Sequence, residues 1–221
     1  MSSVRRHNIT IPKLTPDMLA AWQDIPAAVA SDCLGRAQAM AAAISPLHPS
    51  MRIVAQARTV DCMAADNSAL HAAIGICAPG EVLVCNAQGY TNNAIFGGLM
   101  TRAAMEAEVA GLVIDGSVRD SEEIVEAGFA CYSRGVVPRG PHKGFGGVID
   151  GPIACGGVSV SPGDLIIGDA DGITVVPFAI VEETLEAANA VLEKEAKALA
   201  SLAQGGSLAA VYGVPEITLI D

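Results

Sequence analysis

FGGLMTRAAMEAEVAGLVIDGSVRDSEE, residues 96–123, is the segment around which this chain is organised. The Gly97-Gly98 pair precedes an amphipathic run, so the sequence predicts a helix over Leu99–Val109 that begins at a glycine turn. The short, β-branched run Gly111–Asp115 predicts a strand that is covered on both faces. A polar turn then opens a second helix near residues 120–123.

This segment brings together groups that suit an anion and a cation. Gly97 and Gly98 have no Cβ, so N–H groups at the helix start can approach a ligand closely, and the helix dipole favours an anion there. Arg119 adds a guanidinium, while Asp120 and Glu123 are spaced to face the same side of a first helical turn. Their hard oxygens suit Mg²⁺ or Mn²⁺, which keep several waters and take one or two protein carboxylates.

Each of these residues also has a purely structural interpretation. An Asp at a helix N-cap with Glu three residues later forms a capping box, which is the favoured interpretation of Asp120 and Glu123 taken alone. Arg119 could pair with either acid at the surface, the Gly97-Gly98 pair could form an ordinary turn, and Asp115 could simply end a strand. Only the combination indicates a binding site.

The composition limits the class of protein. With 221 residues, 51% of them hydrophobic, and no uninterrupted apolar run of about 18 residues, the chain is expected to form a single soluble domain over 1–221. The net charge of −11 argues against nucleic acid as the main partner, because phosphate binding needs a clustered basic surface. The first residues contain no secretory h-region, so a cytoplasmic location without membrane attachment is expected. Six cysteines without a CxxC pair predict reduced core thiols rather than disulfides or zinc.

The rest of the chain alternates helical and strand patterns. Thr15-Pro16-Asp17 predicts a helix start, and Val181–Gln204, rich in Ala and Glu, predicts a long C-terminal helix that ends at two glycines. Short apolar runs separated by glycine turns over residues 146–177 predict β structure. Other helices are expected at 16–23, 27–43 and 67–76, and other strands at 52–61, 82–85 and 129–133.

Two segments of the chain resemble each other. PGEVLVCNAQG at residues 79–89 and PGDLIIGDADG at residues 162–172 align without a gap. The favoured interpretation is one turn–strand–turn device used twice in a sheet, rather than a duplicated ligand site. Asp169 and Asp171 lack the further ligands of an EF-hand loop, so a turn is expected there instead of a calcium site.

The central motif resembles a family signature. Gly98, 20 intervening residues, Arg119-Asp120, two more residues and Glu123 are similar to the pattern of RraA-like proteins, which are related to the class II 4-hydroxy-4-methyl-2-oxoglutarate (HMG) aldolases. The flanking segments Asp66-Asn67, 79–84, 111–120 and 162–177 agree, and the resemblance runs from about Leu19 to Gly206. It implies an α/β fold of the swivelling β/β/α type, with a β core flanked by helices. It also implies a homotrimer or a dimer of trimers, with active sites between subunits and the 181–204 helix at an interface.

The resemblance further implies roles for single residues. Arg119 would contact the keto or enolate oxygen of a small 2-oxo acid, and Asp120 would bind a divalent metal, Mg²⁺ or Mn²⁺. The carboxylate of the pyruvyl group would lie on the backbone of four consecutive residues, Gly97, Gly98, Leu99 and Met100.

The chain departs from the dedicated aldolases at one metal-site position. Those enzymes have an Asp where this chain has Gly98, whereas the RraA-like branch has an acid at the position of Glu123. Glu123 is therefore expected to hold the water shell of the metal. In the aldolases a further glutamate comes from the C-terminal helix of a neighbouring subunit. Glu195 is the better match and Glu193 the second, although each alone is more typical of a solvated helix face.

These roles predict a divalent-metal-dependent lyase. Cleavage of a 4-hydroxy-2-oxo diacid between C3 and C4, and loss of CO2 from oxaloacetate, both leave a pyruvate enolate, whose charge a metal and Arg119 would stabilise. The base for the 4-hydroxyl stays open: metal-bound water is the first choice, with Glu123 or Asp115 as orienting residues. The candidates to meet a second carboxylate are Arg102, Arg139 and His142.

Two other functions stay open on the sequence alone. A Schiff-base mechanism needs a lysine that is desolvated or beside another cation, and Lys143, in the glycine-containing segment 138–147, is its only candidate. The RraA-like resemblance also implies a non-catalytic alternative, in which the acidic surface binds a basic segment of an RNA-processing endonuclease.

Overall fold

A ten-stranded β-sheet forms the centre of the molecule in the computed structural model, which describes residues 4–220. Seven strands follow the order β1-β8-β3-β4-β6-β7-β2, β11 joins the sheet at β3 and carries β12, and β5 pairs with β6. A separate hairpin consists of β9 (Ile153–Cys155) and β10 (Val158–Val160). The sheet strands are β1 (Val4–Arg6), β2 (Ser45–Pro46), β3 (Ile53–Cys62), β4 (Val82–Asn86), β5 (Ala94–Phe96), β6 (Gly111–Val118), β7 (Cys131–Val136), β8 (Gly147–Ile149), β11 (Leu165–Asp169) and β12 (Gly172–Val176).

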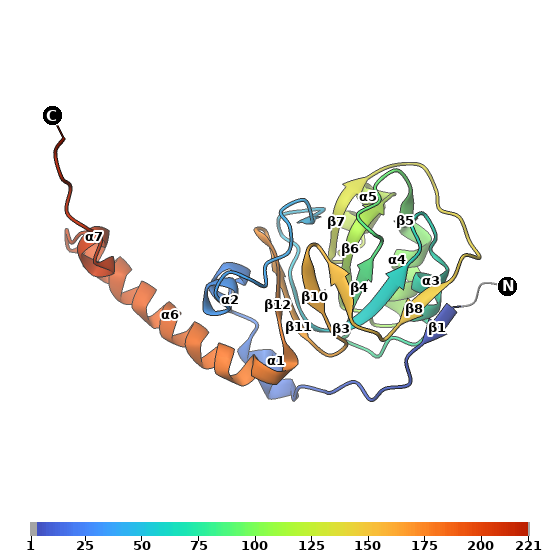
Figure 1. Cartoon of the computed structure of the whole chain (residues 1–221), viewed down its shortest axis with the longest axis horizontal. Coiled ribbons are helices and arrows are strands. Elements are labelled where there is room, and N and C mark those ends of the chain that lie inside the picture. The colour runs from blue at the N-terminus through green and yellow to red at the C-terminus, as the bar shows by residue number, and fades with distance from the viewer. Residues whose placement is uncertain (1–3, 221) are drawn as a thin grey trace.

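Helices and a second β layer cover the central strands. On one face lie α3 (Ser68–Ile74), α4 (Gly98–Glu106) and α5 (Ser121–Glu126), and on the other lie the β9–β10 hairpin and the β11–β12 pair (Figure 1). The far side of β11–β12 packs against three more helices, α1 (Pro16–Ala21), α2 (Ala27–Cys33) and α6 (Val181–Ala203). The expected α/β class, with a β core flanked by helices, is confirmed.

Alternating side chains in the strands separate these layers. On β4, Leu83 and Cys85 belong to the core beneath the helices, whereas Val82 and Val84 belong to the core shared with the second β layer. Successive residues of a strand point to opposite faces, so one buried strand serves two cores. This accounts for the continuous apolar runs that the sequence shows here.

The central segment folds as predicted, with small differences at the element ends. Strand β6 continues to Val118, and α4 ends at Glu106, short of the predicted Val109, because Glu108 adopts a positive φ of 54° that no helix continues through. β3, β4, β6 and β7 pair in parallel, so their carboxyl ends share one edge of the sheet. The helices that follow β5 and β6 start at that edge.

The predicted helix over 27–43 is wrong beyond its first two turns. Helix α2 ends at Cys33, and Gly35 and Arg36 then adopt left-handed conformations with φ of 65° and 64°. Only residues in right-handed geometry extend an α-helix, so the chain turns here. It then runs along the second β layer, where Ala39 bridges to Thr174.

The two similar segments occupy equivalent places beside β3. β4 pairs with β3 in parallel, and β11 pairs with it in antiparallel fashion. Each segment begins with the same turn, in which Glu81 accepts a hydrogen bond from the Ala78 N–H and Asp164 accepts one from the Ser161 N–H. The interpretation as a repeated turn–strand device is confirmed. Asp169 also behaves as a turn residue, since its carboxylate accepts hydrogen bonds from the N–H groups of Asp171 and Ala27.

Most of the cysteines lie in the core, as predicted. Cys62, Cys85, Cys131 and Cys155 are buried. Burial raises the pKa of the Cys155 thiol to about 12, so this group stays protonated near neutral pH.

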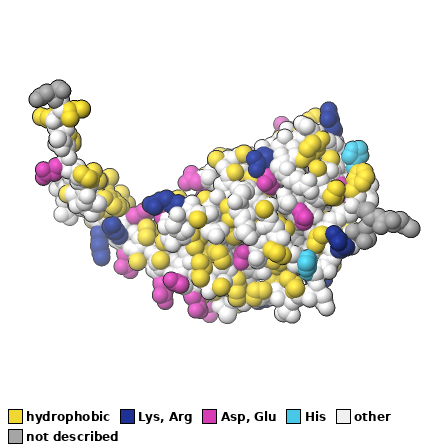
Figure 2. Space-filling model, in the orientation of Figure 1, with side chains coloured by type: hydrophobic (Ala, Val, Ile, Leu, Met, Phe, Trp, Pro, Cys, Tyr) yellow, Lys and Arg dark blue, Asp and Glu magenta, His cyan; other side chains and the backbone are white. Residues whose placement is uncertain are grey.

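The long helix predicted over 181–204 is α6, and it leads away from the sheet. Figure 1 shows α6 running outward to α7 (Leu208–Tyr212), at the end of the molecule opposite β1. Hydrophobic side chains continue along this arm, residues 192–220, in Figure 2, and the exposed ones include Leu199, Ile217 and Leu219. None of the helices within residues 4–220 is both long and apolar enough to cross a lipid bilayer.

A buried ion-pair network joins β3, the turn before β4 and the turn after β8. The Arg58 guanidinium donates to Glu81 at 2.6 Å and to Asp150 at 2.8 Å, and all three side chains are at least 94% buried. Lys13 also donates to Glu81, and Arg6 donates to Asp150 at 2.5 Å. Both buried carboxylates therefore have cationic partners.

This network predicts a loss of stability in acid. Burial by itself would raise the pKa of Glu81, but hydrogen bonds from Arg58, Lys13 and the Ala78 N–H outweigh it and hold the pKa below the ordinary 4.5. A carboxyl with a lowered folded-state pKa stabilises the protein above its unfolded pKa and loses that effect as the pH falls through the folded value. Urea unfolding from pH 7 down to pH 3 should therefore show the unfolding free energy falling below about pH 4.5. Glu81→Gln should show a shallower fall; an identical slope would contradict the assignment.

Candidate active site at the start of helix α4

A surface pocket of about 580 Å³ lies where α4 and α5 begin. Its walls come from β5, α3, the first turns of α4 and α5, and the loop of residues 138–146. The charged residues that line it are Arg102, Arg119, Asp120, Glu123 and Lys143. Four of these five come from the central segment, which the sequence identified as the site.

Asp120 lies against the start of α4. Its Oδ2 atom accepts a hydrogen bond of 3.0 Å from the Gly98 N–H, and a Cβ at Gly97 would lie only 2.7 Å from the same oxygen. Asp120 also adopts a left-handed backbone with φ of 57°, which is uncommon for a residue with a Cβ. The carboxylate therefore meets the positive end of the α4 dipole.

The capping-box interpretation of Asp120 and Glu123 is wrong. Asp120 occupies the N-cap position of α5, but its side chain makes no capping hydrogen bond there. The left-handed backbone directs the carboxylate to the neighbouring helix α4 instead. A cap is a local device, so spacing along one helix cannot reveal a carboxylate that serves a second helix.

Arg119 lies between Gly97, at the start of α4, and Gly140, in the 138–146 loop. Its Nε atom is 3.6 Å from Asp120 Oδ2, and its Nη1 atom would lie 3.0 Å from a Cβ at Gly140. The Arg119 backbone N–H donates to the Phe96 carbonyl at 3.0 Å, which ties the residue to the start of α4. The side chain is 44% exposed, so the guanidinium is positioned yet open to a ligand.

Glu123 fills the space beside Gly98. Arg102 donates to Glu123 Oε1 from Nε at 2.9 Å and from Nη2 at 2.6 Å, and a Cβ at Gly98 would overlap the other end of that carboxylate. An acid at position 123 thus occupies the place that a side chain at position 98 would need. Gly98 therefore leaves room for the Glu123 carboxylate.

The donor set fits a divalent cation that keeps several waters. Among residues 4–220, no group of three or more His, Cys, Asp or Glu side chains is close enough to hold a metal ion. The carboxylates that line the pocket are those of Asp120 and Glu123. In the described chain, hydrogen bonds engage Asp120 Oδ2 and Glu123 Oε1, which leaves one oxygen of each carboxylate without a partner. Two carboxylates open to solvent match the usual protein contribution to a Mg²⁺ site.

The four backbone residues expected to hold a carboxylate divide into two groups. Gly97, Leu99 and Met100 line the pocket, whereas the Gly98 N–H is already used by Asp120. The first N–H groups of a helix have no partner inside that helix. The N–H groups of Leu99 and Met100 are therefore the donors available to an anion.

The structure does not bring Asp115 to the pocket, which corrects its predicted role as an orienting residue. Asp115 is 8% exposed and accepts hydrogen bonds from Arg134 Nε at 2.5 Å and from the Gly156 N–H at 2.8 Å. Gly156 follows β9, in the second β layer. The side chain thus points to the opposite face of the sheet from α4 and serves the packing of that face.

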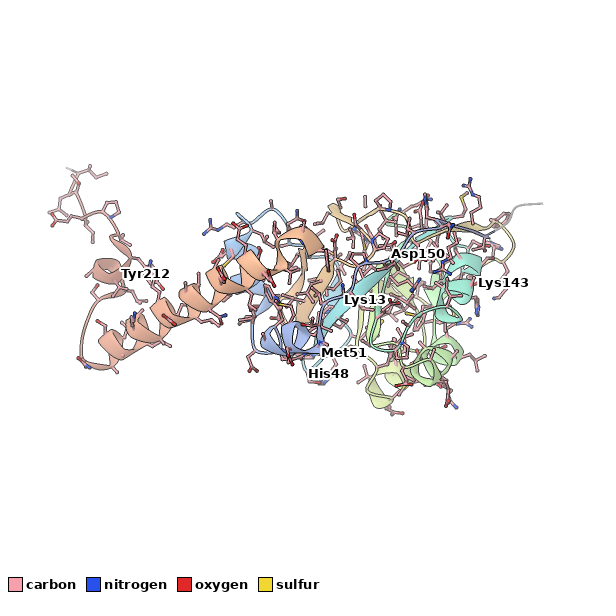
Figure 3. The ribbon with its side chains drawn as sticks, turned by 90° about the horizontal axis from the view of Figure 1, so that it is seen from below. Lys13, His48, Met51, Lys143, Asp150 and Tyr212 are labelled. Atoms are coloured by element: carbon pink, nitrogen blue, oxygen red, sulfur yellow. The ribbon has the colours of Figure 1, made fainter. Side chains whose placement is uncertain are left out.

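Four other predicted residues also lie away from the pocket. Arg139 and His142 belong to the 138–146 loop but do not line the pocket; the His142 ring packs edge-on against Phe145 instead. Glu195 and the second choice, Glu193, are exposed on α6. Figure 3 shows Tyr212, beyond that helix, at the opposite end of the molecule from Lys143. Either glutamate could reach a pocket only in another subunit.

The family model described as "RraA-like: Aldolase/RraA" matches residues 25–175, which is more than half of the chain. The chain belongs to the RraA-like family. This RraA-like protein is 37% identical over 172 residues to "Putative 4-hydroxy-4-methyl-2-oxoglutarate aldolase" of Halalkalibacterium halodurans, with 78% of this chain and 82% of that one covered. It is 36% identical over 117 residues to a protein of the same name from Burkholderia mallei, with 53% and 71% covered.

Solved structures of RraA proteins share the fold of this RraA-like chain. Streptomyces coelicolor RraAS2, described as an unusual member of the RNase ES inhibitor RraA family, superposes with a TM-score of 0.77 at 26% identity, covering 84% of this chain and 98% of that one. The RNA-processing inhibitor RraA from Thermus thermophilis superposes with a TM-score of 0.64 at 27% identity, covering 70% and 93%. The family resemblance and the fold that it implied are confirmed.

In this RraA-like protein, three polar pocket residues escaped the sequence-based site prediction. Asn67 and His71 come from the start of α3, and Lys143 comes from the 138–146 loop. Burial, with the charge of Lys143, lowers the pKa of His71, so its ring is neutral near pH 7. Asn67 was visible in the sequence only as part of the family motif Asp66-Asn67, and Lys143 only as a Schiff-base alternative.

Proposed function

We propose that this protein is a divalent-metal-dependent carbon–carbon lyase that releases pyruvate from 4-hydroxy-2-oxo diacids of the HMG type, decarboxylates oxaloacetate, or does both. One observation carries the proposal: Arg119, Asp120 and Glu123 converge on the glycine-lined start of α4 inside one pocket. The names of the relatives from Halalkalibacterium and Burkholderia support an aldolase-type activity.

The chain's own residues have distinct parts in this reaction. The N–H groups of Leu99 and Met100 bind the substrate's C1 carboxylate at the positive end of the helix dipole. Arg119 donates hydrogen bonds to the 2-keto oxygen and stabilises the negative charge that grows there as the C3–C4 bond breaks. Asp120 and Glu123 would hold Mg²⁺ or Mn²⁺, which would supply a Lewis acid beside the same oxygen.

The proposed reaction is tested by assaying pyruvate release from 4-hydroxy-4-methyl-2-oxoglutarate and from oxaloacetate. Turnover should be abolished by EDTA and restored by Mg²⁺ or Mn²⁺. Turnover that resists EDTA, together with borohydride trapping of substrate on Lys143, would establish an imine mechanism instead.

Gly98→Ala should weaken the metal site without unfolding the protein. The added Cβ overlaps only the end of the flexible Glu123 side chain, so that carboxylate must move while the backbone stays in place. Displacing a group that orients metal ligands typically lowers metal affinity about 10- to 100-fold. Calorimetric Mg²⁺ titration measures the loss, and Gly75→Ala is the control, since its Cβ would meet only the Ala72 carbonyl at 3.6 Å. Unchanged Mg²⁺ affinity would show that Glu123 does not take part in binding the metal.

We also infer a homotrimer or a dimer of trimers, in which Glu195 of a neighbouring subunit completes the metal site. Two large apolar side chains support a covering subunit: Leu99, which lines the pocket, is 84% exposed, and Phe145, in the loop that supplies Lys143 to it, is 57% exposed. Light scattering after gel filtration measures the assembly. Glu195→Gln should weaken Mg²⁺ binding whereas Glu193→Gln should not, and a monomer that binds Mg²⁺ normally would contradict the shared site.

A second function is supported by the structural likeness to RNA-processing inhibitors. In that case the acidic chain, with its net charge of −11, binds basic segments of an RNA-processing endonuclease. Tight binding to such an enzyme, with no turnover of either substrate under any divalent metal, would favour the inhibitor and reject the lyase.

A further inference from the structure

We propose that Asn67 and Lys143 form a distal wall of the pocket that recognises the hydroxyl and the second carboxylate of a 4-hydroxy-2-oxo diacid. This assignment rests on the proposed function, which places the C1 end of the substrate at α4 and Arg119. That placement sets the direction in which the rest of the substrate lies. It replaces Arg139 and His142, which the sequence predicted for the second carboxylate and which do not line the pocket.

Asn67 offers a buried acceptor without a donor. The residue lines the pocket and is only 3% exposed. Its Nδ2 atom donates to the sulfur of Met100 at 3.4 Å, and within the described chain its Oδ1 atom has no hydrogen-bond partner. A buried carbonyl oxygen without a donor is unfavourable, so this position calls for a donor from a ligand.

The contact with Met100 sets the position of this acceptor. Met100 belongs to the first turn of α4, whose N–H groups receive the C1 carboxylate. The Asn67 amide therefore lies beside the part of the pocket that holds the 2-oxo acid group. A hydroxyl a few bonds along the same substrate is a donor of the right kind, whereas a methylene there would leave Oδ1 unpaired.

Lys143 brings a cation to the same wall. Its loop is fastened to the segment before α3: the His142 N–H donates to the Ala65 carbonyl at 2.7 Å, and the Phe145 N–H donates to Asp66 Oδ2 at 3.1 Å. Asp66 is fully buried and also receives the Ser68 N–H at 2.8 Å, so one carboxylate positions both the loop and the start of α3. Figure 3 shows Lys143 at the edge of the molecule next to α3.

The ammonium of Lys143 lacks an acidic partner within the described residues. The two acids of the pocket are paired elsewhere, Asp120 with Arg119 and Glu123 with Arg102. His71 lies one helical turn after Asn67 and lines the pocket as a neutral ring, so it adds no competing charge. The wall therefore carries one unopposed positive charge, which suits a second carboxylate.

Two matched ligand pairs test the wall. For Lys143→Gln, the pair is 4-hydroxy-4-methyl-2-oxoglutarate and 4-hydroxy-2-oxopentanoate, which lacks the second carboxylate. KM for the diacid should rise about 10- to 100-fold, as expected for loss of a charge-assisted hydrogen bond, while KM for the monoacid and both kcat values change less than about twofold. Lys197→Gln, on exposed α6, is the control. Equal effects on both substrates, or none, would overturn the role of Lys143.

For Asn67→Ala, the pair is 4-hydroxy-2-oxoglutarate and 2-oxoglutarate. The variant should bind the hydroxylated ligand about tenfold more weakly and 2-oxoglutarate unchanged. Its thermal stability should be equal to or above that of the parent, because the substitution removes an unsatisfied group. Equal loss of both ligands would assign Asn67 a merely structural role.

Calorimetric binding of these ligands in EDTA separates this proposal from the lyase itself. If each variant selectively loses affinity for its diacid or hydroxylated ligand while the parent shows no turnover, the role of the distal wall is supported and the lyase is rejected. If the parent turns over substrate but neither variant selectively loses affinity for its ligand, the lyase is supported and the role of the distal wall is rejected. Absence of binding by all ligands, with and without Mg²⁺, would reject the wall.

Discussion

Arg119→Ala is expected to lower kcat for pyruvate release by about 10²- to 10³-fold, the usual result of removing a donor aimed at a developing oxyanion. The guanidinium lies 3.6 Å from Asp120 Oδ2 and lines the pocket beside the start of α4, whereas Lys143, another cation of the pocket, comes from the 138–146 loop. Arg102, the other arginine of the pocket, is engaged with Glu123. Steady-state kinetics with both candidate substrates measures the effect.

The controls for Arg119 separate charge from geometry. Arg119→Lys keeps the charge but loses the planar fork of donors, so it should recover only part of the activity. Arg36→Ala removes an exposed guanidinium that pairs with Asp32 on α2 and should leave kcat unchanged. If Arg119→Ala retains more than about a tenth of the parental kcat, the oxyanion role is wrong.

Arg58→Met is expected to lower the free energy of unfolding by about 3–5 kcal/mol, since it leaves two buried carboxylates without their shared partner. The Glu81 and Asp150 side chains are only 3% and 0% exposed, so water cannot take the place of the guanidinium. For a chain of this size the melting temperature should fall by about 6–20 °C. Urea unfolding and thermal melts measure the loss.

The exposed pair Arg36–Asp32 supplies the matched control for Arg58. Arg36→Met breaks an ion pair whose side chains are 78% and 55% exposed, and such pairs contribute at most about 1 kcal/mol. Arg58→Met combined with Glu81→Gln and Asp150→Asn should regain part of the stability, because it removes the uncompensated charges. A loss below about 1 kcal/mol for Arg58→Met alone would show that the network is not needed for stability.

Local patterns predicted most of the elements and failed where backbone geometry broke a pattern. Thr15 caps α1 as expected, with its side chain accepting the Met18 N–H, because a cap depends on neighbouring residues only. The apolar spacing of 27–43 looks helical throughout, yet the left-handed backbone at Gly35 and Arg36 ends the helix. Hydrophobic periodicity carries no information about such single dihedral angles.

The face of a fully buried strand is also hidden from the sequence. All eight residues of β6 are buried, so no alternation of polar and apolar residues shows which side chains point toward α4. Asp115 was therefore assigned to the wrong side. It points to Arg134 and to Gly156 in the second β layer instead.

The sequence by itself determined the alternation of helices and strands and the helix that begins at Gly97-Gly98, because these features depend on periodicity and short spacing. Its resemblance to a family added the layered α/β class and the grouping of Arg119, Asp120 and Glu123 at one site. Only the tertiary structure decided that Asp120 serves α4 rather than its own helix, and that Asn67 and Lys143 share a pocket. Asp120 and Gly98 are 22 residues apart along the chain, and Asn67 and Lys143 are 76 residues apart. These residues meet because parallel strands deliver helix starts and loops to one edge of the sheet. Spacing along a chain cannot express that convergence.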